Sequence, residues 1–311
     1  MKIKNKFVTR SKYWKYKYLK INNNLSLLIK IKNIIENIFR VKILKKKNFE
    51  VLREFYAYPI SRNILKIRNN KLAKILKKFL MKLNILKSEV YLIKLIKKHD
   101  KLFFKFNPVK NNIGGMGYNN SLYLFVYLSV QKKIDMFVES GIWKGYTSFL
   151  IDNAFKKHNK NTAHYKFDIN LGNIIYFSKK AKYFESDLTE YNFQEKKKNS
   201  IFLFDDHVSH YERLQYCHEN EIKQIIFDDD VDYETVHSDG WPPIPTISMI
   251  LSKKKVKKFS WVNSDGLASA IYDLKKINNN ILKKYLISHT INISHVTGYN
   301  NQSRMTFLKK K

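Results

Sequence analysis

Apolar residues recur at helical spacing through the first third of the chain. In the segments 25–47 and 63–87, leucine, isoleucine and phenylalanine fall three or four positions apart, with lysine or arginine between them. This spacing gathers the apolar side chains on one face of a helix. We expect two basic amphipathic helices there and a third at 89–100, with their apolar faces packed against each other and the following domain.

The pattern changes near residue 103, where short apolar runs begin to alternate with helical stretches. Such alternation is typical of βαβ units. The predicted fold is therefore α/β, a Rossmann-like, doubly wound, mostly parallel sheet preceded by a basic α-helical region, with domains at 1–102 and 103–311. The strands are expected at 133–140, 163–170, 181–187, 200–206 and 223–230, the helices at 143–158 and 208–221, and a terminal strand pair at 259–264 and 295–311.

The chain carries a formal net charge of +33, and most of it lies near the N-terminus. Residues 1–100 hold 28 Lys and Arg against 5 Asp and Glu, a net charge of +23. Such a field attracts the phosphates of nucleic acids or anionic lipids. An equal alternative is codon bias, because Lys, Asn and Ile all have AT-rich codons. We expect residues 1–100 to contact an anionic membrane or a polyanion. The apolar faces of the helices could also form an interface between copies of the chain, so an oligomer is an alternative.

Cysteine content and hydropathy indicate a compartment. The single cysteine, Cys217, excludes an internal disulfide and is typical of a reducing environment. The basic N-terminus has no uninterrupted apolar segment of the secretory type. No run of 18 apolar residues is present to span a membrane. We expect a cytoplasmic protein, with peripheral membrane contact as an option.

The segment FVESGIWKGYTS (137–148) joins the first predicted strand to its helix. Glu139 ends the strand, Gly141 follows, and Gly145 lies where the helix opens. Glycines allow a sharp turn and the close approach of a ligand, and the helix N-terminus offers unpaired N–H groups. The segment lacks the three closely placed glycines of dinucleotide sites. It matches the looser E-x-G-x-x-x-G turn of class I S-adenosylmethionine (SAM) methyltransferases.

Two further acids end the next two strands. Asp168 ends the second strand, where a carboxylate suits the hydroxyls of a ribose, and Asp187 ends the third, near the place of an adenine amino group. The alternative is that both acids cap the elements that follow them. We expect a nucleoside cofactor to be bound by Glu139, Gly141, Gly145, Asp168 and Asp187.

The fourth and fifth strands end in the acidic sequences DDH (205–207) and DDD (228–230). In a parallel sheet both sequences reach the same edge. Clustered carboxylates repel one another, and Mg²⁺ relieves the repulsion while keeping sites for water and substrate oxygens. Such an ion could bind a vicinal diol and lower the pKa of one hydroxyl, whose proton His207 or His210 could accept. The alternative is a pair of acidic loops with no ligand.

Together, FVESGIWKG, FDIN, FLFDDHVSHYERL and IIFDDD resemble the class I SAM-dependent methyltransferase superfamily over residues 104–311. Within it they resemble the metal-dependent sugar O-methyltransferases, the macrocin O-methyltransferase and cephalosporin hydroxylase-like group. The resemblance implies an O-methyltransferase that uses SAM and Mg²⁺ on a hydroxyl of a sugar or surface-polysaccharide acceptor. It implies metal ligation by Asp205 or Asp206 with Asp228 and Asp229. We assign Asp205, Asp228 and Asp229 to the metal and Asp206, His207 and His210 to catalysis.

Other functions fit parts of the same sequence. FDDD (227–230) is also typical of the metal–nucleotide-sugar site of a glycosyltransferase, in which the glycine turn would have no special role. Alternatively, the basic third binds nucleic acid or a membrane surface, and the α/β domain is an inactive platform. The rigid Trp-Pro-Pro at 241–243 is expected to form a wall of the acceptor pocket.

Overall fold

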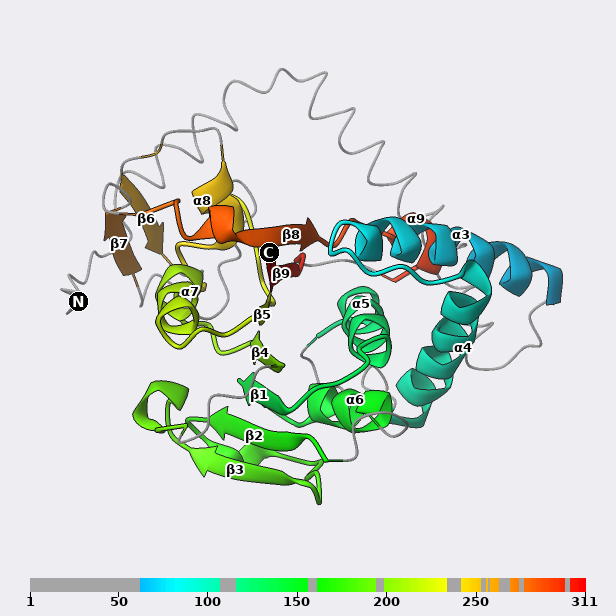
Figure 1. Ribbon diagram of the computed structural model, residues 1–311, viewed down its shortest axis with the longest axis horizontal. Helices are drawn as coiled ribbons and strands as arrows, with labels where there is room; N and C mark the ends of the chain where they lie inside the picture. Colours follow the sequence, from blue (N-terminus) through cyan, green and yellow to red (C-terminus); the bar gives the residue numbers. More distant parts are fainter. Residues whose placement is uncertain are drawn as a thin grey trace, which may run out of the picture. The chain divides into compact units, whose positions relative to one another are not determined.

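Figure 1 shows the computed structural model of the chain, which forms two compact units. The larger unit comprises Ser61–Val236, Pro242–Lys253 and Ile277–Lys311, and the smaller comprises Met1–Ile60, His237–Trp241 and Lys254–Lys276. The structure describes residues 62–106, 116–155, 161–193, 199–233, 242–252, 256, 258–262, 269–273, 277–299 and 303–311. The helix expected at 25–47 lies outside these residues. Within them, no helix has the length and apolar content needed to cross a membrane.

A seven-stranded sheet forms the centre of the larger unit, in the order β3-β2-β1-β4-β5-β9-β8. Strands β1 to β5 are parallel, and β9 is antiparallel to both β5 and β8. The predicted fold class, a mostly parallel Rossmann-like sheet, is confirmed. The bounds are Met136–Ser140 (β1), Ala163–Asp168 (β2), Ala181–Glu185 (β3), Ser200–Phe204 (β4), Gln224–Phe227 (β5), Tyr285–His289 (β8) and Thr306–Lys310 (β9).

The direction of chain progress reverses between β1 and β4. From β1 the chain adds β2 and β3 on one side and β4 and β5 on the other. Open α/β sheets bind ligands at the carboxyl ends of the strands beside such a reversal. The turn after β1 and the acidic sequences after β4 and β5 all lie at this edge, which we call the carboxyl rim.

Helices cover both faces of the sheet (Figure 1). Helices α5 (Tyr118–Ser129) and α6 (Tyr146–Phe155) lie on one face and α7 (His210–Glu219) lies on the other. Strand side chains alternate between two cores in accordance with the two-residue period of a strand. Thus Leu203 packs in the core that includes α5 and α6, while Phe204 packs in the core that includes α7.

The basic helices predicted at 63–87 and 89–100 are confirmed as α3 (Arg62–Met81) and α4 (Glu89–Phe106). Their apolar faces share one core with α5, as expected. The expected domain boundary at 102/103 falls inside α4. The remaining elements are η1 (Leu171–Asn173), η2 (Leu188–Glu190), α8 (Ile247–Leu251), η3 (Leu282–Lys284) and α9 (Ser294–Thr297).

Two parts of the fold differ from the expectation. Helix α5 has no counterpart in the predicted elements, because all twelve of its residues are buried and it therefore lacks the exposed polar face that gives an amphipathic helix its period. The expected strand at 259–264 does not join the sheet. It is β6 (Lys258–Val262), which pairs with β7 (Ser269–Asp273) in a separate two-stranded sheet of the smaller unit, and β8 takes its expected place beside β9.

Candidate functional site at the carboxyl rim

The turn between β1 and α6 requires glycine at both of its glycine positions. Gly141 has φ of 87°, and a Cβ atom on it would lie 2.1 Å from the carbonyl oxygen of Asp205. Gly145 has φ of 88°, and its Cβ would lie 2.6 Å from the carbonyl oxygen of Tyr176. The Gly141 N–H donates to the Phe167 carbonyl at 2.9 Å. The turn is therefore packed against the end of β4 with no room for a side chain.

The Asp168 carboxylate holds this turn from the end of β2. One oxygen, Oδ2, accepts the N–H groups of Ile142 at 2.7 Å and Trp143 at 3.0 Å. The other, Oδ1, accepts the Asn170 N–H at 3.0 Å. Asp168 lies at the carboxyl rim, as predicted. Its hydrogen bonds show that it also holds the turn in place, and its contact with a ribose stays a prediction.

Glu139 is fully buried on the face of the sheet covered by α6. Its Oε2 accepts hydrogen bonds from Ser148 Oγ at 2.8 Å and from Lys166, its in-register neighbour on β2. Burial raises the pKa of Glu139, and the charge of Lys166 opposes that rise. No donor among the described residues reaches the buried Oε1. Glu139 is thus a half-satisfied carboxylate at the end of β1.

Asp187 and Asp206 are bound to one arginine of α7. Arg213 donates to Asp187 Oδ1 and to Asp206 Oδ2, both at 2.9 Å, and Ser140 Oγ donates to the same Asp206 oxygen at 2.6 Å. Asp187 also accepts the Thr189 N–H at 2.8 Å as the N-cap of η2. Burial alone would raise the pKa of Asp187, but the bonds from Arg213 and Thr189 outweigh it and hold the pKa well below its usual range.

This arrangement favours the alternative that Asp187 caps the element that follows it. It also indicates that Asp206 holds Arg213 and Ser140 in place. Sequence reasoning missed Arg213. The available signal was its spacing, because Arg213 shares the buried face of α7 with Leu214 and Cys217. A charged side chain at such a position requires an oppositely charged partner.

His210 lies in the core rather than at the surface of the site. Its side chain is 2% exposed, its ring lies 4.5 Å from the Phe227 ring, and its Nδ1 accepts the Ile247 N–H at 3.4 Å. Burial lowers the pKa of His210, although Asp230 and other carboxylates oppose the change. A neutral imidazole with this packing is suited to support the rim. Its predicted role as a base is not favoured by this geometry.

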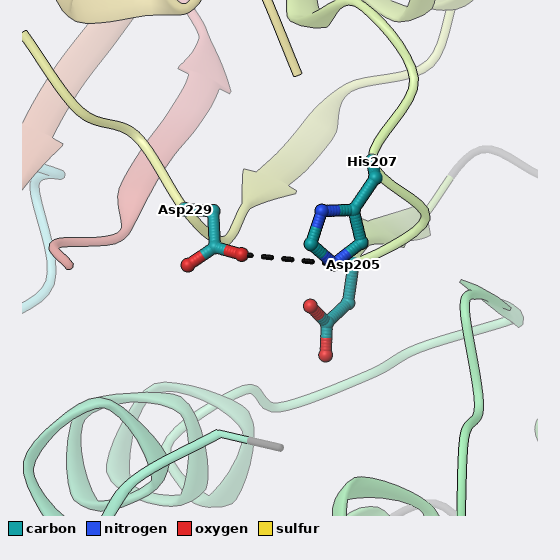
Figure 2. Close-up of side chains that lie close together, drawn as sticks. All are labelled: Asp205, His207 and Asp229. Atoms are coloured by element: carbon teal, nitrogen blue, oxygen red, sulfur yellow. Dashed lines mark ion pairs between the residues drawn. The ribbon is translucent and has the colours of Figure 1, made fainter. Parts of the chain in front are cut away.

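Three side chains converge at the rim from the ends of β4 and β5. One ligand atom each from Asp205, His207 and Asp229 lies within 4.8 Å of the others (Figure 2). His207 Nε2 lies 3.9 Å from Asp229 Oδ2, the ion pair drawn in Figure 2. His207 and Asp229 have φ of 57° and 51°, a left-handed conformation that costs energy in residues other than glycine. Carboxylate and imidazole ligands at this spacing fit a divalent cation with open coordination positions.

Asp228 lies beside this group but faces α5. It is 5% exposed, and its Oδ1 accepts a hydrogen bond from Asn120 Nδ2 at 3.0 Å. Burial and the neighbouring Asp229 raise its pKa well above the usual range. Of the three predicted metal ligands, the structure thus brings Asp205 and Asp229 together, and His207 stands in the third position. Asn120 could not be found from the sequence because α5 itself was not predicted.

Negative charge exceeds positive charge at this part of the rim. Burial raises the pKa of Asp205 well above its usual range, and the charges of Asp228, Asp229 and Glu139 raise it further. Lys166 and Arg213 are already bound, Lys166 to Glu139 and Arg213 to Asp206. A shallow pocket here is lined by Phe204, Asp205, Asp206, His207, His210, Asp228, Asp229 and Pro243. Of the expected Trp-Pro-Pro wall, Pro243 lies in this lining and Trp241 lies outside the described residues.

Comparison with known proteins yields only remote likenesses. No family model and no curated protein match the chain. Among solved structures, it is similar to a provisionally assigned O-methyltransferase from Klebsiella pneumoniae, with 10% identity and a TM-score of 0.35 over 75% of this chain and 95% of that chain. It is also similar to the plantazolicin methyltransferase BpumL in complex with S-adenosylhomocysteine (SAH) and a monoazolic desmethylPZN analog, with 10% identity and a TM-score of 0.32 over 87% of this chain and 97% of that chain. Identities and TM-scores this low carry no functional assignment to this chain.

Proposed function

We propose that the chain is a SAM-dependent O-methyltransferase that acts on a hydroxyl of a sugar or surface-polysaccharide acceptor, assisted by a divalent cation. The sheet supports the proposal. Its parallel strands in the order β3-β2-β1-β4-β5, followed by the antiparallel β9 beside β5, have the topology of the superfamily that the sequence resembles. Ligands of such sheets bind at the reversal between β1 and β4, where Gly141 lies.

The observation that carries the proposal is the unbalanced negative charge beside the glycine turn. Asp205, Asp228 and the half-satisfied Glu139 lie on the side of the rim that faces α5 and α6, and burial raises the pKa of each. A buried carboxylate is stabilised by a cationic ligand. SAM supplies such charge through its sulfonium and ammonium groups, together with an electrophilic methyl group. SAH lacks the sulfonium charge, so this part of the rim favours the substrate form over the product.

Methyl transfer forms a bond between the acceptor oxygen and the methyl carbon while the sulfur–carbon bond breaks and its electron pair stays on sulfur. The acceptor hydroxyl also loses its proton, which passes to solvent water. The protein is expected to contribute mainly by aligning the two reactants. Asp205, His207 and Asp229 would hold a divalent cation, which lowers the pKa of a hydroxyl that binds to it. The sugar class of acceptor rests on the resemblance, because adjacent sugar hydroxyls suit such an ion.

Calorimetric titration of the full chain with SAM and SAH tests the proposal. In the presence of a chelator, wild type should bind SAM, and Asp205→Asn should weaken SAM binding about tenfold, the loss expected from roughly one charge interaction of 1.4 kcal/mol. SAH affinity should fall less. The matched control is Glu190→Gln, which removes an exposed carboxylate on η2.

Three outcomes would reject the proposal. These are no SAM binding by wild type, an equal loss of SAM affinity in Asp205→Asn and Glu190→Gln, and binding of UDP with Mn²⁺ in preference to SAM. The last result would favour the glycosyltransferase alternative. The acceptor class is tested separately by measuring transfer of a labelled methyl group from SAM to a panel of saccharides. A label that survives treatment with base would show that the product is a methyl ether.

A further inference from the structure

Helices α3 and α4 each present a stripe of lysines on the face opposite their shared core. On α3 the exposed side chains follow the spacing of one helix face, from Ile67 at one end to Met81 at the other, with Lys71, Lys74 and Lys78 between them. Because the buried residues of α3 fall on the opposite face, the lysines point away from the core.

Helix α4 repeats this arrangement. Its exposed face begins with Val90 and continues through Lys94, Lys97, Lys101 and Lys105. The two helices pack on each other through their apolar faces. We call the seven lysines of the two stripes, together with Ile67, Met81, Leu86 and Val90, the α3–α4 surface.

The charge of the α3–α4 surface is not neutralised by neighbouring acids. Residues 62–106 contain fourteen Lys and Arg against two acidic residues, a net charge of +12. Both acids are already bound elsewhere, Glu89 to Lys77 at 3.5 Å and Asp100 to the buried Arg68 at 2.9 Å. Among the described residues, no stripe lysine forms an ion pair. The surface is therefore suited to a partner with many negative charges.

Large apolar side chains are exposed among these lysines. Leu86, in the connection between the helices, is 76% exposed, Val90 is 66% exposed, Ile67 57% and Met81 48%. A nucleic acid backbone gains little from aliphatic side chains. A bilayer interface gains from both features, because lysines contact anionic headgroups while aliphatic side chains enter the boundary with the acyl chains.

We propose that the α3–α4 surface binds an anionic lipid membrane peripherally. Lysines of the two stripes contact the headgroups, and the exposed aliphatic side chains insert between them. The proposal concerns a partner of the whole protein and does not depend on the reaction carried out at the carboxyl rim.

Co-sedimentation of the full chain with vesicles tests the proposal. Wild type should bind phosphatidylcholine vesicles containing phosphatidylserine, should bind phosphatidylcholine alone poorly, and should dissociate as salt is raised. Changing Lys71, Lys74 and Lys78 together to Gln should weaken partitioning about tenfold or more. The control changes Lys179, Lys180 and Lys182 to Gln, which removes the same charge from exposed positions outside α3 and α4 and should change partitioning less than about twofold.

A second variant, Leu86→Ser with Val90→Ser, removes apolar surface without changing charge and should weaken partitioning several-fold. Unfolding midpoints matching wild type would show that each variant remains folded. Equal losses in the two lysine variants would overturn the proposal, since net charge alone would then explain binding. Unchanged partitioning of the serine variant, or tighter binding to duplex DNA or RNA than to the anionic vesicles, would also overturn it.

Discussion

The two sides of the carboxyl rim use carboxylates in opposite ways. On the side facing α7, Asp187 and Asp206 share Arg213, so that each carboxylate has a cationic partner within the protein. On the side facing α5 and α6, Asp205 and Asp228 have raised pKa values. The first arrangement stabilises charged carboxylates within the fold, whereas in the second a cationic ligand would stabilise the charged form that burial disfavours.

Asp205 and Asp206 show how close the two arrangements are in sequence. They follow one another directly after β4, yet their carboxylates have different neighbours. Asp206 accepts a hydrogen bond from Arg213 on α7, while the charges of Asp228 and Asp229 raise the pKa of Asp205. Neighbours of identical chemistry thus acquire different roles from the residues that surround each one.

Removing the charge of Arg213, on the side of the rim that faces α7, should have the largest effect on stability. Arg213→Met leaves two carboxylates without their partner and should lower the free energy of unfolding by about 3–5 kcal/mol, measured by urea denaturation at neutral pH. The exposed control Lys132→Met should change it by less than about 0.5 kcal/mol. Similar losses in the two variants would show that the Arg213 network does not stabilise the fold.

The same network predicts a pH dependence. Because the folded pKa of Asp187 is depressed, its stabilisation is present above its unfolded pKa of about 4 and is lost as pH falls toward the folded value. Wild type should therefore lose stability on acidification below about pH 5, and Arg213→Met should lose less. Parallel curves for the two proteins would argue against the assignment.

The two histidines should differ by a smaller amount. His210→Ala removes a buried ring that packs on Phe227 and should cost about 2 kcal/mol in the free energy of unfolding. His207→Ala, at a half-exposed position, should cost less than about 0.5 kcal/mol while weakening Mn²⁺ binding in calorimetry. A stability loss at His207 equal to that at His210, or unchanged Mn²⁺ affinity, would contradict this division.

The smallest expected change is a gain in stability on the side of the rim that faces α5 and α6. Asp205→Asn removes a carboxylate whose charged form is disfavoured by burial and by the neighbouring acids, so it should raise the free energy of unfolding of the metal-free protein at neutral pH. Since the folded pKa of Asp205 is raised, the penalty in wild type appears as pH rises above the unfolded value of about 4, and the two proteins should converge below it. Thermal unfolding with Mn²⁺ added should then raise the midpoint of wild type more than that of the variant. The opposite order would refute the proposed cation site.

The five parallel strands were predictable because each is a short run rich in apolar residues that ends at Gly or Asp or is soon followed by one of them. Helix α5 was not, since complete burial removes the period by which a helix is recognised. β6 was placed in the wrong sheet, because its apolar content is that of any strand and partner choice depends on distant residues. Because α5 was not predicted, its residue Asn120, which donates a hydrogen bond to Asp228, was not predicted as part of the site.

The sequence alone indicated the α/β class, the basic helices, the glycine turn and the acid-rich ends of two adjacent strands, because each leaves a local pattern of spacing or composition. Only the tertiary structure distinguished Asp206, which is bound to Arg213, from Asp205, which is grouped with His207 and Asp229. It also separated the buried His210 from the half-exposed His207. The physical reason is that a carboxylate or an imidazole acts through what surrounds it, and those surroundings come from helices and strands far away in the chain.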